Sequence, residues 1–258
     1  MRCASRLTRT YATTLRSCAE AVTATPQRTY RYYDFVMAAF VAVLICSNFI
    51  GAAKQAVIDL PLLGPTPFGA GVLFFPISYI FGDILTEVYG YGRDRRVVWA
   101  GFGALAFASF MSWVVVSLPP GPSDYMKTYQ PALDAVFGNA WRIALGSMIA
   151  FWSGSFVNSY VLAKMKIWSA GKWLWTRIIG STIAGEFVDS SLFYGIAFYG
   201  IWESSDIVKV AMIQYVLKTG WEVVMTPVTY RVVAFLKRAE NEDYYDRHTN
   251  FTPFRVKV

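Results

Sequence analysis

Residues 75–99 of the 258-residue chain are FPISYIFGDILTEVYGYGRDRRVVW, and this stretch contains the pattern that decides the fold. An apolar run carries Asp83 and Glu87, a basic GRDRR segment follows it, and a second apolar run begins at Val97. Membrane spans need roughly 20 apolar residues each, and cytoplasmic loops are rich in Arg and Lys. The stretch therefore predicts two membrane-spanning helices joined by a short basic turn.

The composition of the whole chain agrees with a membrane protein. Hydrophobic residues make up 55% of it, aromatic residues 17% and charged residues only 16%, which is too apolar for an ordinary water-soluble domain. The apolar runs predict an all-α, polytopic membrane protein, a bundle of six transmembrane helices joined by short loops. The expected spans are Tyr32 to Ala53, Gly69 to Tyr91, Val97 to Leu118, Trp141 to Ala163, Leu174 to Ile201 and Ile207 to Leu236.

Basic residues gather in the tails and in alternate loops, and this distribution predicts the orientation. Under the positive-inside rule both termini face the cytoplasm, which an even number of spans allows. The net charge of +7 is therefore interpreted as a topology signal rather than as a nucleic-acid-binding surface. The basic side contains Arg28, Arg31, Arg93, Arg95, Arg96, Lys164, Lys166, Lys172, Lys237 and Arg238, whereas the other side contains Lys54, Lys127, Arg142 and Lys209.

Three segments follow from this topology: a disordered cytoplasmic arm at residues 1–30, the transmembrane domain at 31–238 and a cytoplasmic tail at 239–258. The arm is rich in Arg, Thr and Ala with Glu20 as its single acid, a composition that also fits an organellar transit peptide. The chain has no HExxH, GxSxG or GxxxxGK[ST] motif, and its one histidine, His248, is in the tail. We therefore expect no enzyme activity, no cofactor and no metal site.

Ionisable residues inside the expected spans are the main functional signal. Inserting one such residue into the bilayer costs at least about 2.5 kcal/mol, so several in one bundle indicate a polar interior that has a function. They occur as pairs spaced i,i+3 or i,i+4, which places both members on one helix face. The pairs are Asp83 with Glu87, Glu186 with Asp189, and Lys218 with Glu222, and two amides, Asn48 and Asn158, lie in spans one and four.

Each of these features also has a structural interpretation. The pair in span six could be an intrahelical ion pair, the pair in span two could form a charge network with the arginines that follow it, and the amides could bridge helices. Glu186 and Asp189 have no cation within one helical turn. We expect these two carboxyl groups to lie near the membrane midplane, where secondary transporters bind substrate, and to share one proton.

Residues that disturb helices lie in the same spans. We expect Pro76 and Pro227 to interrupt spans two and six, and Gly180 and Gly185 to loosen span five. Broken or bent helices free backbone groups that can line a cavity.

The opening stretch and five further motifs resemble the queuosine precursor transporter family. The resemblance extends from about residue 32 to the C-terminus, with the motifs in the family's order. It implies a bacterial inner-membrane importer with six helices that takes up 7-cyano-7-deazaguanine, 7-aminomethyl-7-deazaguanine or queuine for tRNA modification. Residues 1–30 lie outside the family pattern, and Glu186 stands where the family usually has Gln or Asn. The further motifs are SNFIGAAK (47–54), NSYVLAKMKIW (158–168), WLWTRIIGSTIAGEFVDSSLF (173–193), YVLKTGWEVVMTPVTYRVV (215–233) and TNFTPF (249–254).

The polar residues suit such a ligand. A guanine-like edge donates hydrogen bonds to carboxylates and accepts one from an amide or ammonium group, and an aromatic ring could stack on the flat heterocycle. Tyr79, Trp152 and Trp221 are the candidates for stacking. The expected substrate-binding residues are Asn48, Tyr79, Asp83, Glu87, Asn158, Glu186, Asp189, Lys218 and Glu222.

Three classes of function compete. The first is a secondary transporter that works alone or as a homodimer, since the chain has no nucleotide-binding motif. The second is the substrate-binding membrane subunit of an energy-coupling-factor type importer, which needs an external ATPase. The third is an intramembrane enzyme. Co-purification of ATPase subunits distinguishes the second class from the first.

The orientation is testable by labelling. A cysteine introduced near Ser123 should react with an impermeant thiol reagent added outside the cell, and a cysteine near Ser169 should not, because the loops that contain them face opposite sides. The reverse pattern would contradict the predicted topology.

Overall fold

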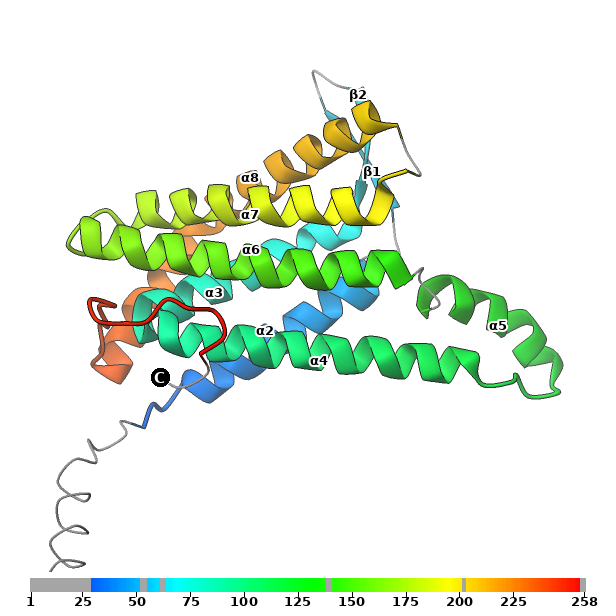
Figure 1. Ribbon diagram of the computed structural model, residues 1–258, viewed down its shortest axis with the longest axis horizontal. Helices are drawn as coiled ribbons and strands as arrows, with labels where there is room; N and C mark the ends of the chain where they lie inside the picture. Colours follow the sequence, from blue (N-terminus) through cyan, green and yellow to red (C-terminus); the bar gives the residue numbers. More distant parts are fainter. Residues whose placement is uncertain (1–28, 52–54, 61–63, 138–140, 201–202, 256–258) are drawn as a thin grey trace, which may run out of the picture. The chain divides into compact units, whose positions relative to one another are not determined.

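The computed structural model describes residues 29–51, 55–60, 64–137, 141–200 and 203–255 (Figure 1). All its helices and strands belong to one compact unit, Tyr32–Val258. The other unit is Met1–Arg31, so the expected N-terminal arm lies almost entirely outside the described residues. The elements are α2 (Tyr33–Cys46), a π-helical turn η1 (Ser47–Gly51), β1 (Gln55–Leu60), β2 (Gly64–Gly69), a 3₁₀ turn η2 (Ala70–Leu73), α3 (Phe75–Tyr89), α4 (Tyr91–Ser117), α5 (Asp124–Phe137), α6 (Trp141–Trp168), α7 (Leu174–Phe198) and α8 (Ser204–Glu240).

Seven α-helices in the described ranges confirm the expected all-α class, with one β-hairpin added to it. The segment LPLLGPTPFG was expected to be a loop, but β1 and β2 pair antiparallel, with Gln55 opposite Gly69 and Leu60 opposite Gly64. Both strands are edges of a two-stranded sheet. Pro65 has no N–H to donate, and because β2 pairs with β1 alone, no third strand needs that donor, which is why a strand tolerates proline here.

Helix α5 corrects a second expectation, because its segment lies between the expected spans Val97 to Leu118 and Trp141 to Ala163 and was therefore predicted to be a loop. The backbone N–H of Met126 donates to Ser123 Oγ at 3.3 Å, as at a helix N-cap, and Asp124 lies in the first turn. Pro131 lies inside the helix, and none of the side chains of α5 is buried. The Ser-Asp capping pair was the sequence signal for this helix.

Within the described ranges, three segments are long and apolar enough to cross a membrane: Tyr33–Ile50, Ala70–Tyr89 and Tyr91–Ser117. Helices α6, α7 and α8 have 28, 25 and 37 residues. At about 1.5 Å per residue, each exceeds the roughly 30 Å of bilayer hydrocarbon. Their sequences are more polar, because their middle turns carry Asn158, Glu186, Asp189, Lys218 and Glu222.

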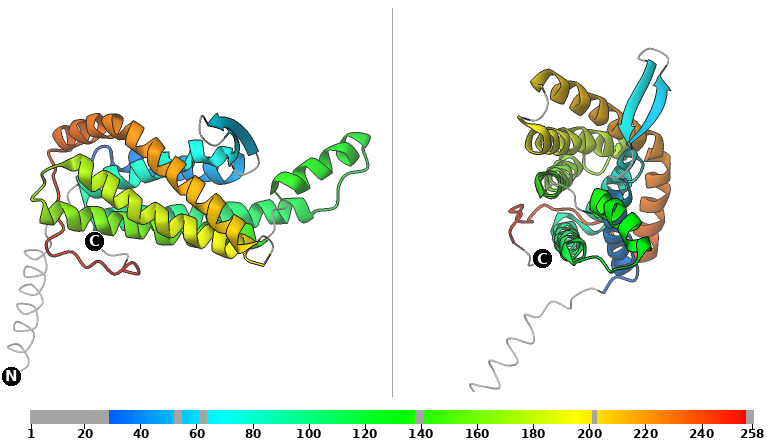
Figure 2. Two further views of the ribbon diagram at one scale, coloured as in Figure 1. Left: turned by 90° about the horizontal axis from the view of Figure 1, so that it is seen from above. Right: turned by 90° about the vertical axis from the view of Figure 1, so that its right-hand side faces the viewer.

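Helix α3 lies at the centre of the bundle. It packs against α2, α4, α6 and α8 within the bundle (Figure 2). Twelve of its fifteen residues are buried. Polar side chains such as Asp83 and Glu186 are buried, while large apolar ones such as Phe107, Trp113 and Val224 are exposed. This arrangement is the reverse of that in a water-soluble protein and suits a lipid environment.

The two prolines expected to interrupt helices do not break them. Pro76 stands in the first turn of α3, where its missing N–H has no helical partner and its fixed φ favours helix initiation. Pro227 lies inside α8, which continues without a break to Glu240.

Helices α6 and α7 pack closely through two glycines. A Cβ atom on Gly185 would lie 2.7 Å from Asn158 Cβ and 3.0 Å from the Gly154 carbonyl oxygen. A Cβ atom on Gly154 would lie 2.8 Å from Asp189 Cβ. Gly185 therefore allows the two backbones to approach, as small residues do between membrane helices, rather than loosening α7.

This packing predicts that Gly185→Ala lowers the melting temperature of the purified protein by several degrees, since overpacking costs about 1–3 kcal/mol. Gly195→Ala on the same helix is the matched control, because a Cβ there meets nothing within 4 Å. Thermal unfolding in detergent measures both. Equal melting temperatures for the two variants would contradict the close approach.

Candidate functional site

The first polar group inside the bundle joins α7 and α8. Lys218 Nζ lies 2.6 Å from Asp189 Oδ2 and 3.0 Å from Glu186 Oε2. All three residues are buried, and Glu186 has no exposed surface. Lys218 Nζ also lies 5.1 Å from the centre of the Phe75 ring, a cation–π contact with the start of α3. We call Lys218, Glu186 and Asp189 the Lys218 triad.

The triad changes two expectations from the sequence. Lys218 donates to Asp189 across the helix interface rather than pairing with Glu222 one turn away. The carboxyl groups of Glu186 and Asp189, for which the sequence showed no cation within one helical turn, both contact this ammonium group, and their sharing of a proton stays a prediction. Spacing along one helix could not show that the neighbouring helix offers partners at shorter range.

A second polar group joins α3, α6, α7 and α8. Asn158 Nδ2 donates to Asp83 Oδ1 at 2.8 Å, and Thr182 Oγ1 donates to Glu222 Oε1 at 2.5 Å. The carboxyl groups of Asp83 and Glu222 lie within hydrogen-bonding reach of each other. Each of these two acids is only 1% exposed. We call Asp83 and Glu222 the carboxyl pair.

Tyr79 lies between the two groups. Its side chain is buried, and its hydroxyl stands where a Cβ on Gly154 would be, next to Asp189. A small cavity of about 10 Å³ adjoins it, lined by Ser78, Gly82 and Asn158 among others. Such a volume holds about one water molecule. The polar interior is therefore closed in this conformation.

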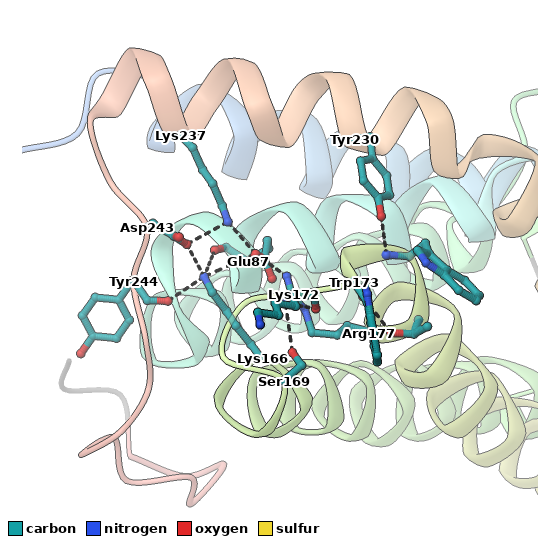
Figure 3. Close-up of polar contacts among 12 residues, drawn as sticks. Glu87, Lys166, Ser169, Lys172, Trp173, Arg177, Tyr230, Lys237, Asp243 and Tyr244 are labelled. Carbon is teal, nitrogen blue, oxygen red and sulfur yellow. Dashed lines mark hydrogen bonds and ion pairs between the residues drawn. The ribbon is translucent and has the colours of Figure 1, made fainter.

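Glu87 belongs to a separate cluster at the end of α3 (Figure 3). Its Oε1 atom lies 2.6 Å from Lys237 Nζ, 2.8 Å from Arg177 Nη2 and 3.5 Å from Lys166 Nζ. Asp243 Oδ1 lies 2.6 Å from Lys166 Nζ and 2.8 Å from Lys237 Nζ. We call these five residues the Glu87 cluster. It connects α3, α6, α7, α8 and the segment after α8.

The expected partners of Glu87 were wrong in detail. The sequence suggested the arginines that follow α3, but Arg93 and Arg95 donate hydrogen bonds to backbone carbonyls and lie over the rings of Tyr244 and Tyr91. The actual cations come from three other helices. They were missed because a charge network between distant segments leaves no local spacing pattern.

The C-terminal segment, residues 241–255, packs against the bundle at this end. The Tyr244 N–H donates to the Val88 carbonyl at 3.3 Å, and Asp246 Oδ2 accepts from the Tyr91 N–H at 3.0 Å. Arg95 Nη1 donates to the Asn250 carbonyl at 2.8 Å. The segment therefore covers the junction between α3 and α4.

Two carboxyl groups of this segment have shifted pKa values. Burial alone would raise the pKa of Asp243, but hydrogen bonds from Lys166 and Lys237 outweigh it and hold the pKa below its ordinary value. Burial raises the pKa of Asp246, which the hydrogen bond from the Tyr91 N–H only partly offsets. Asp243 is therefore the ionised partner of the two lysines at neutral pH.

The remaining candidates lie away from the polar interior. Asn48 Oδ1 accepts from Ser147 Oγ at 2.6 Å, so this amide bridges η1 to α6. Trp152 packs on Trp99 and on Phe254 of the C-terminal segment, with ring centres 5.8 and 5.7 Å apart. Trp221 is 36% exposed on α8. Of the three aromatic candidates for stacking, Tyr79 is the one beside the carboxylates.

The described part of the chain contains no group of three or more His, Cys, Asp or Glu side chains arranged to hold a metal ion. The carboxyl groups of the interior face an ammonium, an amide, a hydroxyl or one another. The interior can therefore bind a polar organic ligand through hydrogen bonds, and it can bind protons.

Comparison with known proteins identifies the family. Residues 69–232 match the Vut_1 family model, described as "Putative vitamin uptake transporter". A protein of Bacillus subtilis (strain 168), named "Probable queuosine precursor transporter", is 30% identical over 187 residues, which is 72% of this chain and 78% of that protein. The chain belongs to this vitamin uptake transporter family. No solved structure matches it.

Family membership confirms the resemblance found in the sequence and makes the protein a transporter rather than an enzyme. The matched range includes the Lys218 triad, the carboxyl pair and Glu87, whereas Asn48 lies outside it. The transporter therefore has its buried polar groups within the part of the chain that defines the family.

The Glu87 cluster predicts that Glu87→Gln markedly lowers the melting temperature of the transporter, because three cations lose their buried counter-charge. Breaking a buried ion pair typically costs about 3–5 kcal/mol. Asp124→Asn is the matched control, since Asp124 pairs with Lys127 on the surface and is 96% exposed. Thermal unfolding in detergent compares them, and a similar small effect for both would contradict the cluster's structural role.

Proposed function

We propose that this transporter imports 7-deazaguanine precursors, namely 7-cyano-7-deazaguanine, 7-aminomethyl-7-deazaguanine or queuine, across the inner membrane for queuosine modification of tRNA. The observation that carries the proposal is the Lys218 triad, a donor and two acceptors buried among helices of a family of transporters. The name of the Bacillus subtilis relative supports the same substrate class.

The triad has the hydrogen-bonding groups that a guanine-like edge needs. Glu186 Oε1 has no hydrogen-bond donor among the described residues, so it can accept from a ring N–H or an exocyclic amino group. The Lys218 ammonium can donate to the ligand's carbonyl oxygen, and the Tyr79 ring lies alongside for stacking. Two carboxylates against one ammonium leave a net negative charge, which favours the cationic aminomethyl precursor over the neutral cyano form.

The proposed topology has six spans, formed by α2, η2 with α3, α4, α6, α7 and α8, and the hairpin and α5 lie outside the hydrocarbon. Arg93, Lys166 and Lys237 belong to the end of the bundle that carries the Glu87 cluster and the C-terminal segment. By the positive-inside rule this end, with both termini, faces the cytoplasm. The described part of the predicted cytoplasmic tail (239–258), residues 239–255, then covers this end of the bundle.

Transport requires this closed conformation to open. Secondary transporters expose a central site to each side in turn by moving one group of helices against another. Here the Glu87 cluster and the C-terminal segment close the proposed cytoplasmic end. Opening that end must separate Glu87 on α3 from Lys166 and Lys237 on α6 and α8.

Uptake of labelled precursors by cells that lack their own synthesis tests the proposal. Asp189→Asn should reduce uptake of the cyano and aminomethyl precursors at least about tenfold, because the Lys218 ammonium loses its shortest carboxylate contact, and tenfold corresponds to about 1.4 kcal/mol. Glu186→Gln should preserve uptake but weaken the preference for the aminomethyl form. Glu203→Gln, at an exposed position before α8, is the control.

Calorimetry on the purified variants separates binding from folding. Wild-type affinity in folded Asp189→Asn protein would remove Asp189 from the site. Uptake that depends on co-purifying ATPase subunits would favour the energy-coupling-factor type of importer over a transporter that works alone or as a homodimer.

A further inference from the structure

The carboxyl pair has an unusual hydrogen-bond balance. One oxygen of each acid receives a donor, Asn158 Nδ2 for Asp83 Oδ1 and Thr182 Oγ1 for Glu222 Oε1. The other oxygens, Asp83 Oδ2 and Glu222 Oε2, receive no hydrogen bond from any donor in the described ranges. The two carboxyl groups nevertheless interact with each other, and the hydroxyl of Ser181 on α7 also faces Asp83.

Two ionised carboxylates cannot satisfy each other, since both are acceptors only. In a buried site of low dielectric constant their mutual repulsion is large. A single proton converts one acid into a donor, and the pair then forms an O–H···O hydrogen bond. This arrangement therefore requires one proton held between α3 and α8.

Among the described residues that face the pair, no cation replaces that proton. From α3 the nearest titratable neighbours are Glu87 and Tyr79, from α4 Asp94, and from α7 Glu186, while α6 contributes the neutral Asn158. Lys218 on α8 directs its ammonium at the two carboxylates of the triad instead.

The hydroxyl of Tyr79 is a second buried polar group that suits a site where a proton binds and leaves. Its hydroxyl is buried, has no hydrogen-bond partner among the described residues, and lies among the carboxyl groups of the triad and the pair. A tyrosine hydroxyl can accept a hydrogen bond from a protonated carboxyl group in one state and donate one to a carboxylate in another. The Tyr79 hydroxyl can therefore form a hydrogen bond with a neighbouring carboxyl group whether that group is protonated or ionised.

We propose that Asp83 and Glu222 form the proton-binding site of this transporter, and that one proton bound there is carried with each substrate molecule. This inference rests on the proposed function and assigns the substrate to the Lys218 triad and the proton to the carboxyl pair. When the proton leaves, the two ionised carboxylates repel each other and separate α3 from α8. The contact between these helices then couples protonation to opening of the bundle.

Purified full-length protein in liposomes tests the coupling, with labelled 7-cyano-7-deazaguanine as the probe. An inward proton gradient should drive accumulation of the label above its external concentration, and a sodium gradient at equal pH should not. Addition of substrate should also make a weakly buffered external medium more alkaline. Glu222→Gln, which resembles a permanently protonated acid, should lower gradient-driven accumulation at least about tenfold while substrate exchange across the membrane continues.

Asp83→Asn repeats the test from α3, and Glu203→Gln is the exposed control that should leave both assays unchanged. Wild-type accumulation that ignores the proton gradient, or that follows sodium, would overturn the proton site. Absence of any exchange by wild-type protein would instead overturn the proposed function, so the two failures are distinguishable. If both variants fail to fold, the alkalinisation measured with wild-type protein decides alone.

Discussion

The contact of the Lys218 ammonium with Asp189 and Glu186 is the constraint on which the bundle depends. A charge inside hydrocarbon is costly unless it is paired and enclosed. The triad joins α7 to α8, and α3 and α6 lie against the same helices. The glycines at positions 154 and 185 allow α6 and α7 to close around these groups. The apolar side chains then face outward, where lipid can solvate them.

A second consequence is that the two acidic residues of α3 lie in different surroundings. Its end carries Glu87, which contacts three cations beside the C-terminal segment and is proposed to close the cytoplasmic end of the bundle. Its middle carries Asp83, which faces the carboxyl group of Glu222 and, in the described part of the chain, no cation. Two acidic residues one turn apart on α3 are therefore proposed to have different roles, because different neighbouring helices surround them.

The sequence predicted which polar residues are buried but not which residues they contact. The sequence identified the buried ionisable residues, because an ionisable residue in an apolar span can be recognised from the sequence alone. These residues are Asp83, Glu186, Asp189, Lys218 and Glu222. Their partners were not found, since Lys218 was compared with Glu222 on its own helix rather than with Asp189 on α7. Helix α5 was missed because proline clusters flank its Ser-Asp cap.

The sequence by itself determined the all-α membrane class, the family and the set of buried polar residues. Hydropathy, charge and motif order depend only on residues close together in the sequence or on their order along it. The tertiary structure alone decided which of those residues meet. It placed a cation between Glu186 and Asp189, brought Asp83 to Glu222 and drew Lys166, Arg177 and Lys237 onto Glu87. The physical reason is that hydrogen bonds and ion pairs act over about 3 Å, and only the packing of helices distant in sequence brings these atoms that close.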